Sequence, residues 1–191
     1  MKKRIIPLLL ILALCLAGCG SGGAVGAGNA RMRVVTTTYP IYLFASALTR
    51  DVDGVVVERL DTGSTSCLHD YTLSVNDMKK LADADVIALN GAGLEDFMGD
   101  ALAASDAAVI DCSEGIELLP ALGHEGHDHD TEYDPHIWMC EESALVMMNN
   151  ILHGLGALDE KNLDCYRENA AAAAALVPED DARMENLACP Y

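Results

Sequence analysis

The chain has 191 residues, 51% of them hydrophobic, and a formal net charge of −18 at pH 7. This charge argues against nucleic acid as a partner, because binding a polyphosphate backbone requires clustered basic side chains. The length allows one ordinary domain with a real core and excludes two large ones once the N-terminal leader is set aside.

The N-terminus has the pattern of a bacterial export signal. Lys2-Lys3-Arg4 precede an apolar run over residues 5–14, which is too short to span a bilayer as a mature helix. Leu16-Ala17-Gly18-Cys19 is similar to a lipobox, in which the Cys is acylated. We predict a signal peptide over 1–18 and a lipidated Cys19 with a flexible tether over 19–30. An ordinary secretory signal with an incidental cysteine is the alternative.

Strand and helix patterns alternate from residue 31 to residue 111. Strands are predicted over residues 33–38, 54–60, 85–90 and 107–111. Helices are predicted over 41–50 after Pro40, from the N-cap Ser74 through Ala82, and over 94–104. Asp77 completes a capping box with Ser74. Such alternation indicates right-handed crossovers. The predicted fold class is therefore α/β, with a four-stranded parallel sheet flanked by helices.

The pattern changes to helix alone after Trp138. Apolar residues with helical spacing predict one helix that ends at Gly154 and Gly156. Asp159 is expected to cap a second helix, which contains the alanine run 170–175 and is interrupted at Pro178.

Histidines in two loops indicate a transition-metal site. Ligands of parallel sheets bind beyond the carboxyl ends of the strands, where the loops 61–73 and 112–134 are expected. His69 and His136 are the predicted ligands, since neutral imidazole binds Zn²⁺ well. Asp134 either orients His136 through a hydrogen bond or caps the turn before Pro135.

A tract rich in His, Asp and Glu precedes this motif. Its members His124, His127 and His129 are candidate auxiliary metal ligands, and a solvated polar loop is the alternative interpretation.

The cysteines give a second possible ligand set. Five remain once Cys15 is cleaved off and Cys19 is lipidated, and their odd number and irregular spacing argue against a disulfide framework. Cys67 and Cys140 could in principle complete a Cys₂His₂ site, but their spacing is not that of a zinc ribbon.

Five motifs together resemble the zinc/manganese solute-binding proteins of ABC importers, cluster A-I. In chain order they are Val35-Thr-Thr-Thr-Tyr-Pro40, His69-Asp-Tyr71, Ala82-Asp-Ala-Asp-Val-Ile87, Asn90-Gly-Ala-Gly-Leu-Glu95 and Asp134-Pro-His-Ile-Trp138. The resemblance implies two α/β lobes joined by a long helix, with the metal held between them by three His and one carboxylate. His69 and His136 align with the two ligands of the N-terminal lobe.

The resemblance stops before a second lobe. It implies an α/β metal-binding lobe over 31–140 with a His-rich loop over 123–133, and a helical segment over 141–191 that is a truncated inter-lobe helix. The second lobe, with the third His and the carboxylate, is expected to be absent.

The function implied is metal capture outside the cell by a non-enzyme. The expected protein is an extracytoplasmic lipoprotein, anchored to the bacterial membrane, which binds Zn²⁺, or else Mn²⁺, for the permease of an ABC importer. Alternatives are a surface adhesin or partner-binding lipoprotein, and a non-functional fragment. A zinc hydrolase is a further alternative, against which the chain lacks a His-Glu-x-x-His motif.

Overall fold

The computed structural model describes residues 31–60, 71–121 and 133–177. Cys19, His69, His124, His127 and His129 lie outside these ranges. The elements in chain order are β1 (Met32–Thr36), α2 (Tyr39–Leu48), β2 (Val55–Arg59), α3 (Val75–Ala82), β3 (Val86–Leu89), the 3₁₀ turn η5 (Asp96–Met98), α4 (Gly99–Ala103), β4 (Ala108–Asp111), the 3₁₀ turn η6 (Ile137–Met139), α5 (Glu141–Leu158), the 3₁₀ turn η7 (Glu160–Asn162) and α6 (Leu163–Ala174).

The four strands form one parallel sheet in the order β2-β1-β3-β4, which confirms the predicted fold class. The chain moves outward from β1 to β2 and then crosses back to β3 on the other side of β1. The carboxyl ends of β1 and β3 therefore lie side by side at the point where the strand order reverses. In open α/β sheets this is where ligands bind.

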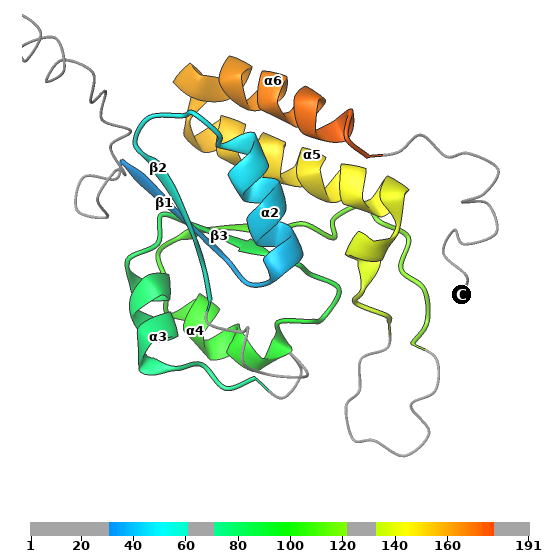
Figure 1. Cartoon of the computed structure of the whole chain (residues 1–191). Coiled ribbons are helices and arrows are strands. Elements are labelled where there is room, and N and C mark those ends of the chain that lie inside the picture. The colour runs from blue at the N-terminus through cyan, green and yellow to red at the C-terminus, as the bar shows by residue number, and fades with distance from the viewer. Residues whose placement is uncertain (1–30, 61–70, 122–132, 178–191) are drawn as a thin grey trace, which may run out of the picture.

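Helices cover both faces of the sheet. α2, α5 and α6 pack on one face, and α3 and α4 lie on the other (Figure 1). Alternation along β1 separates the two cores: Val34 faces α2, α5 and α6, and Val35 faces α3 and α4. Both valines are buried, as expected for a strand covered on both sides.

The helices α2 and α3 both start at a side-chain cap, of which only the one at Ser74 was predicted. The Thr38 hydroxyl accepts a hydrogen bond from the Ile41 amide at 3.4 Å, and Pro40 stands in the first turn of α2. Ser74 and Asp77 form the predicted capping box of α3, because each side chain accepts a hydrogen bond from the other residue's amide.

The predicted end of the first C-terminal helix is wrong. α5 continues through Gly154 and Gly156 to Leu158. The two glycines lie where side chains of neighbouring elements come close to the helix, so they serve packing and do not end it. A Cβ at Gly154 would lie 2.4 Å from Ile110 of β4, and one at Gly156 would lie 2.6 Å from Leu163 of α6. The absence of side chains here lets α5 approach its neighbours.

Asp159 does not cap the following helix as predicted. Its carboxylate forms no capping hydrogen bond. It accepts hydrogen bonds from the side chains of Arg31, Asn162 and Tyr166 instead. A hydrogen bond to the charged Arg31 side chain is stronger than one to a backbone amide, so the carboxylate points to Arg31 and away from the helix start. The 3₁₀ turn η7 precedes α6.

The predicted helix over 94–104 is also shorter than expected. Only the turn η5 and the five residues of α4 form in this segment. Leu94 follows a turn in which Gly91, Ala92 and Gly93 all have positive φ, and its amide donates to the Gly91 carbonyl. The next residue, Glu95, accepts hydrogen bonds from the amides of Asn90 and Gly91. Among the described residues, the helices are too short or too polar to cross a bilayer.

Candidate metal centre

A buried carboxylate joins the ends of the two central strands. Glu95 Oε1 accepts hydrogen bonds from the Thr37 hydroxyl at 2.5 Å and from the Asn90 amide at 2.8 Å. Its Oε2 accepts one from the Gly91 amide at 3.0 Å. Burial raises the pKa of Glu95, and these three hydrogen bonds oppose that rise. Glu95 thus ties the carboxyl end of β1 to that of β3 through its hydrogen bonds.

The Asn90 side chain connects these strand ends to the loop that carries His136. Its Nδ2 donates hydrogen bonds to the carbonyl oxygens of Gly91 at 3.1 Å and Pro135 at 2.9 Å. Asn90 and Pro135 are both buried. The segment before α5 is therefore held against the carboxyl end of β3. Ligand-binding loops of parallel sheets are expected at this end of the strands.

Asp134 both caps the turn and orients His136, so the two roles left open by the sequence coexist. Asp134 Oδ1 accepts a hydrogen bond from the His136 amide at 2.9 Å and lies 2.6 Å from His136 Nδ1. A carboxylate can only accept, so Nδ1 carries the proton. In the neutral form of such a ring Nε2 keeps its lone pair, and Nε2 is the atom that a metal ion would bind.

The His136 ring is half exposed and packs edge-on against Trp138. Its side chain is 50% exposed, and the two ring centroids are 5.2 Å apart with an interplanar angle of 60°. One side of the imidazole is thus shielded while the ring remains accessible from solvent. This combination suits a metal ligand at the mouth of a site.

His69 lies outside the described residues, and its meeting with His136 stays a prediction. The chain re-enters the described structure at Tyr71, whose hydroxyl donates a hydrogen bond to Asp77. The Tyr71 ring packs edge-on against Phe97, with centroids 5.8 Å apart. Phe97 follows Glu95 by two residues, so the chain two residues beyond His69 is anchored close to the same rim.

The His-rich tract begins and ends at one place. Pro120 and Tyr133 form an antiparallel bridge, and the Asp134 amide donates to the Leu119 carbonyl at 2.9 Å. His124, His127 and His129 themselves are outside the described residues. The bridge that closes the tract nevertheless lies only three residues before His136.

The described cysteines give no support to a Cys₂His₂ site. Cys112 and Cys165 are free thiols, and Cys67 lies outside the described residues. Burial raises the pKa of Cys112, which keeps it protonated. Within the described ranges, no group of three or more His, Cys, Asp or Glu side chains is arranged to hold a metal ion.

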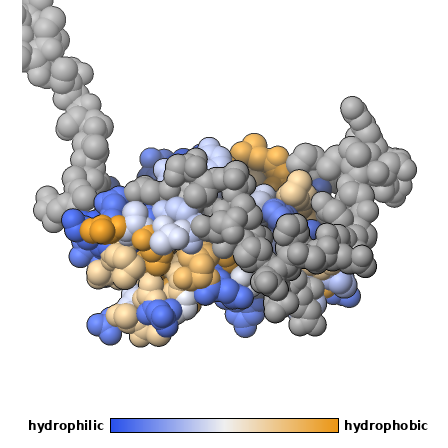
Figure 2. Space-filling model, turned by 90° about the horizontal axis from the view of Figure 1, so that it is seen from below, coloured by the Kyte–Doolittle hydropathy of each residue, from blue (hydrophilic) through white to orange (hydrophobic). Residues whose placement is uncertain are grey.

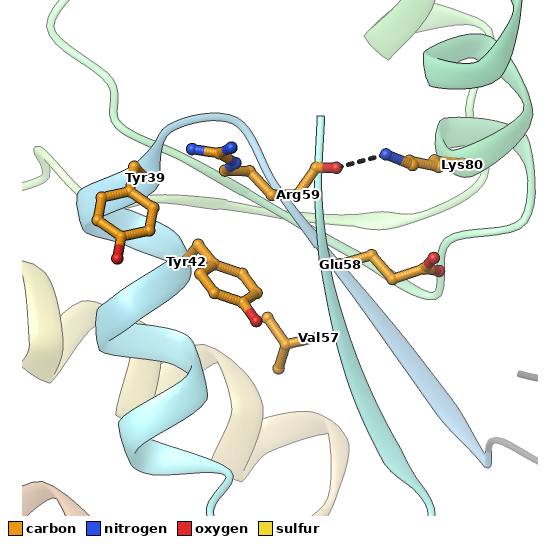
Figure 3. Close-up of a pocket in the computed structure, with 6 residues that line it drawn as sticks. All are labelled: Tyr39, Tyr42, Val57, Glu58, Arg59 and Lys80. Carbon is orange, nitrogen blue, oxygen red and sulfur yellow. Dashed lines mark hydrogen bonds between the residues drawn. The ribbon is translucent and has the colours of Figure 1, made fainter. Parts of the chain in front are cut away.

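A separate hollow of about 400 Å³ lies along the outer strand β2, and its chemistry does not suit a metal ion (Figure 3). Tyr39, Tyr42 and Val57 provide apolar walls. The Arg59 guanidinium lies 5.2 Å from the centre of the Tyr39 ring, and Lys80 Nζ donates to the Arg59 carbonyl at 2.6 Å. Glu58 also lines the hollow, and its carboxylate accepts a hydrogen bond from Arg33 at 3.3 Å. Arg59 and Lys80 disfavour a bound cation and protect the sheet edge from pairing with another chain.

The surface on the side of α3 and α4 carries apolar groups scattered between polar ones (Figure 2). Val75 and Met78 are exposed apolar residues of α3. They lie three positions apart on one helix face, and so small an apolar patch does not mark a site.

Sequence reasoning did not assign a role to Thr37, Asn90 or Glu95. Each follows directly after a strand or turn at the rim, and polar residues in such places are the available signal. Their partners are far apart in sequence, however, so which pairs form could be learned only from the folded chain.

Comparison with known proteins gives a consistent result. A family profile described as zinc-uptake complex component A, periplasmic (ZnuA), matches residues 34–189. The zinc-binding lipoprotein AdcA of Streptococcus pneumoniae serotype 4 is 28% identical over an alignment of 184 positions that covers 90% of this chain and 35% of AdcA. The metal ABC transporter substrate-binding lipoprotein FimA of Streptococcus parasanguinis is 30% identical over 185 residues, covering 90% of this chain and 57% of FimA.

Solved structures show the same fold. Zn(II)-bound AdcA from Streptococcus pneumoniae has a TM-score of 0.64 at 26% identity, over 76% of this chain and 30% of that one. A Mn-bound periplasmic metal binding protein from candidatus liberibacter asiaticus has a TM-score of 0.63 at 24% identity, over 76% and 52% of the two chains. The chain spans about a third of the length of the AdcA relatives that it matches.

Proposed function

Because the chain belongs to the family of periplasmic zinc-uptake complex component A, we propose that it captures a metal ion outside the cell, with Zn²⁺ as the favoured cargo. The observation that carries the proposal is the pairing of His136 Nδ1 with Asp134, 2.6 Å apart. It favours the tautomer in which Nδ1 carries the proton and Nε2 is available to a metal ion. An imidazole whose tautomer is set by a carboxylate partner is typical of transition-metal ligands.

The proposed ligands are His69 and His136, one from each of two loops at the rim. A tight zinc site needs four ligands in a tetrahedron, so these two supply half of it. His124, His127 and His129 are proposed to collect ions near the rim with lower affinity. Imidazole favours Zn²⁺ over Mn²⁺, which prefers oxygen ligands, and Mn²⁺ is therefore the second candidate cargo.

The proposed location follows from the N-terminal motif. Residues 1–18 are a signal peptide, Cys19 carries the lipid and residues 19–30 are the tether to the bacterial membrane. The lobe over 31–140 holds the ion and passes it to the permease of an ABC importer, and the segment 141–191 begins the link to a second lobe. In this role the protein binds and releases an ion and performs no reaction.

Calorimetric titration with Zn²⁺ and Mn²⁺ tests the proposal on the full mature chain. We expect Zn²⁺ to bind more tightly than Mn²⁺, and His136→Ala to weaken zinc binding at least tenfold. His153→Ala is the matched control, since His153 is exposed on α5. Zinc binding no tighter than that of a synthetic peptide of residues 122–132, or binding unchanged in His136→Ala, would overturn the proposal.

A further inference from the structure

We infer that Asn90 is a positioning residue for His136, holding the backbone of the Asp134–His136 turn where the imidazole faces the rim. The inference rests on the proposed function in that it explains how one proposed ligand is placed. Asn90 is 45 positions from Pro135 in the chain, yet Nδ2 donates to the Pro135 carbonyl at 2.9 Å. That carbonyl belongs to the peptide group whose nitrogen is the amide of His136.

Both amide protons of Asn90 are used. The second bond goes from Nδ2 to the Gly91 carbonyl at 3.1 Å, so the side chain cannot rotate without breaking one of the two. Asn90 is fully buried, where water does not compete for these donors. The position of the Pro135 carbonyl is therefore set by the end of β3 through one rigid side chain.

The backbone of Asn90 is itself held in place by hydrogen bonds. Its backbone amide is shared between Glu95 Oε1 at 2.8 Å and Thr37 Oγ1 at 3.2 Å. A continuous set of hydrogen bonds thus leads from the ends of β1 and β3 to the turn that carries His136. Asp134 completes it by binding the imidazole itself, at 2.6 Å from Nδ1.

The bonding of Asn90 favours positioning over simple stabilisation. Its Oδ1 is buried and accepts no hydrogen bond within the described structure. A buried acceptor without a donor carries a free-energy penalty, which an apolar residue at this position would avoid. Asn90 supplies two hydrogen-bond donors and leaves one acceptor unsatisfied. This combination is expected if the residue is kept because its two donors hold particular carbonyl groups in place.

Two other asparagines provide matched controls. Asn150 Nδ2 donates to the carbonyls of Cys112 at 3.0 Å and Glu114 at 2.9 Å. Asn169 Nδ2 donates to the carbonyls of Leu48 at 3.0 Å and Arg50 at 2.8 Å. Replacing any of the three by Ala removes two hydrogen bonds to backbone carbonyls, but only Asn90 holds the turn of His136.

The experiment compares Asn90→Ala with Asn150→Ala by two readouts on the full mature chain. The first is the Zn²⁺ dissociation constant, for which we expect at least a tenfold increase in Asn90→Ala and less than a twofold change in Asn150→Ala. The second is the pair of His136 ring ¹⁵N signals without metal at one fixed pH. They should show a single Nδ1–H tautomer in the wild type and a tautomer mixture in Asn90→Ala.

The outcomes separate the two claims. If the wild type binds no zinc, the proposed function fails, while the ¹⁵N signals still decide the role of Asn90. If Asn90→Ala and Asn150→Ala change both readouts equally, or Asn90→Ala changes neither, the positioning role is wrong. Asn90→Ser, which keeps one hydroxyl donor, replaces Asn90→Ala should that variant not fold, and is expected to give an intermediate loss of affinity.

Discussion

Arg31 Nη2 donates a hydrogen bond to Asp159 Oδ2 at 2.6 Å, although 128 positions separate the two residues. The bond joins the residue before β1 to the junction of α5 and α6. Tyr166 and Asn162 donate to the same carboxylate oxygen at 2.8 Å and 2.9 Å. Asp159 is thus the point where the first and last described parts of the fold are tied together.

Acid should weaken the fold through Asp159. The hydrogen bond from Arg31 is the main cause that lowers the pKa of Asp159 from 3.8 to about 2, and burial opposes it. A folded pKa below the unfolded one gives stability that is present above about pH 4 and is lost as pH falls toward 2. Because the Arg31 side chain is 38% exposed, we expect only about 1–2 kcal/mol.

Urea unfolding of Asp159→Asn at pH 7, 4 and 2.5 measures this contribution. The variant should be less stable than the wild type at pH 7 and should approach it at the lowest pH. Asp164→Asn is the control, since Asp164 is 91% exposed and its ion-pair partner in the described structure is the likewise exposed surface residue Arg167. A constant difference between Asp159→Asn and the wild type across the three pH values would contradict the assignment.

Gly154→Ala should destabilise the chain although alanine favours helix. The new Cβ would lie 2.4 Å and 2.5 Å from two side-chain atoms of Ile110, so either the Ile110 side chain or α5 must move. Overpacking of this kind costs about 1–3 kcal/mol, against a gain in helix propensity of roughly 1 kcal/mol.

Gly99→Ala is the matched control because a Cβ there meets no atom within 4 Å. It should leave stability unchanged or increase it slightly. Thermal unfolding of both variants checks the contrast, and equal melting temperatures would show that the Ile110 side chain or α5 can shift without cost.

Loss of the Asp134 carboxylate should weaken zinc binding without unfolding the chain. Asp134→Ala frees the His136 tautomer, and loss of such an outer partner lowers metal affinity by about 10–100-fold. Asp111→Ala removes a similar turn, in which Asp111 Oδ1 accepts from the Ser113 amide at 2.8 Å and from its hydroxyl at 2.6 Å. Calorimetry should show reduced zinc affinity for Asp134→Ala alone, and an equal reduction in both variants would refute the role of Asp134.

The described cysteines should differ sharply in reactivity. Burial raises the pKa of Cys112, so little thiolate forms, whereas Cys165 is exposed on α6. A maleimide at neutral pH should label Cys165 promptly and Cys112 only in denaturant. Peptide mass spectrometry reports both sites, and rapid labelling of Cys112 in the folded chain would mean that its core opens.

Replacement of Glu95 should loosen the rim. Glu95→Gln keeps the side-chain volume but replaces one acceptor oxygen by an NH₂ donor. This donor would face groups that themselves donate, namely the Thr37 hydroxyl and the backbone amides of Asn90 and Gly91. We expect a loss of about 1–3 kcal/mol, measured by urea unfolding at pH 7. Glu114→Gln, on an exposed residue, is the control and should stay within about 0.5 kcal/mol of the wild type.

Local patterns predicted most of the fold. The β-branched runs around Val34 and Val56 and the capping box at Ser74 act over a few residues, and all formed as expected. The errors came where distant contacts override local preference. Gly154 remains inside a helix because Ile110 requires space there, and Asp159 leaves its cap for Arg31.

The candidate site was predicted only in part for the same reason. The local context of His136 indicated Asp134 as its partner, since the two residues are only two positions apart in the turn. The contact of Asn90 with Pro135 depends on how β3 and the segment before α5 pack. No short-range pattern contains that information.

The bridge between Pro120 and Tyr133 has a consequence for the variability of the chain. Because the two ends of the histidine-rich insert meet at one clasp, its length and histidine number can change by mutation or design without displacing the rim behind it. The scaffold and the histidine-rich tract can therefore diverge at independent rates, and tracts of other composition could be grafted between Pro120 and Tyr133.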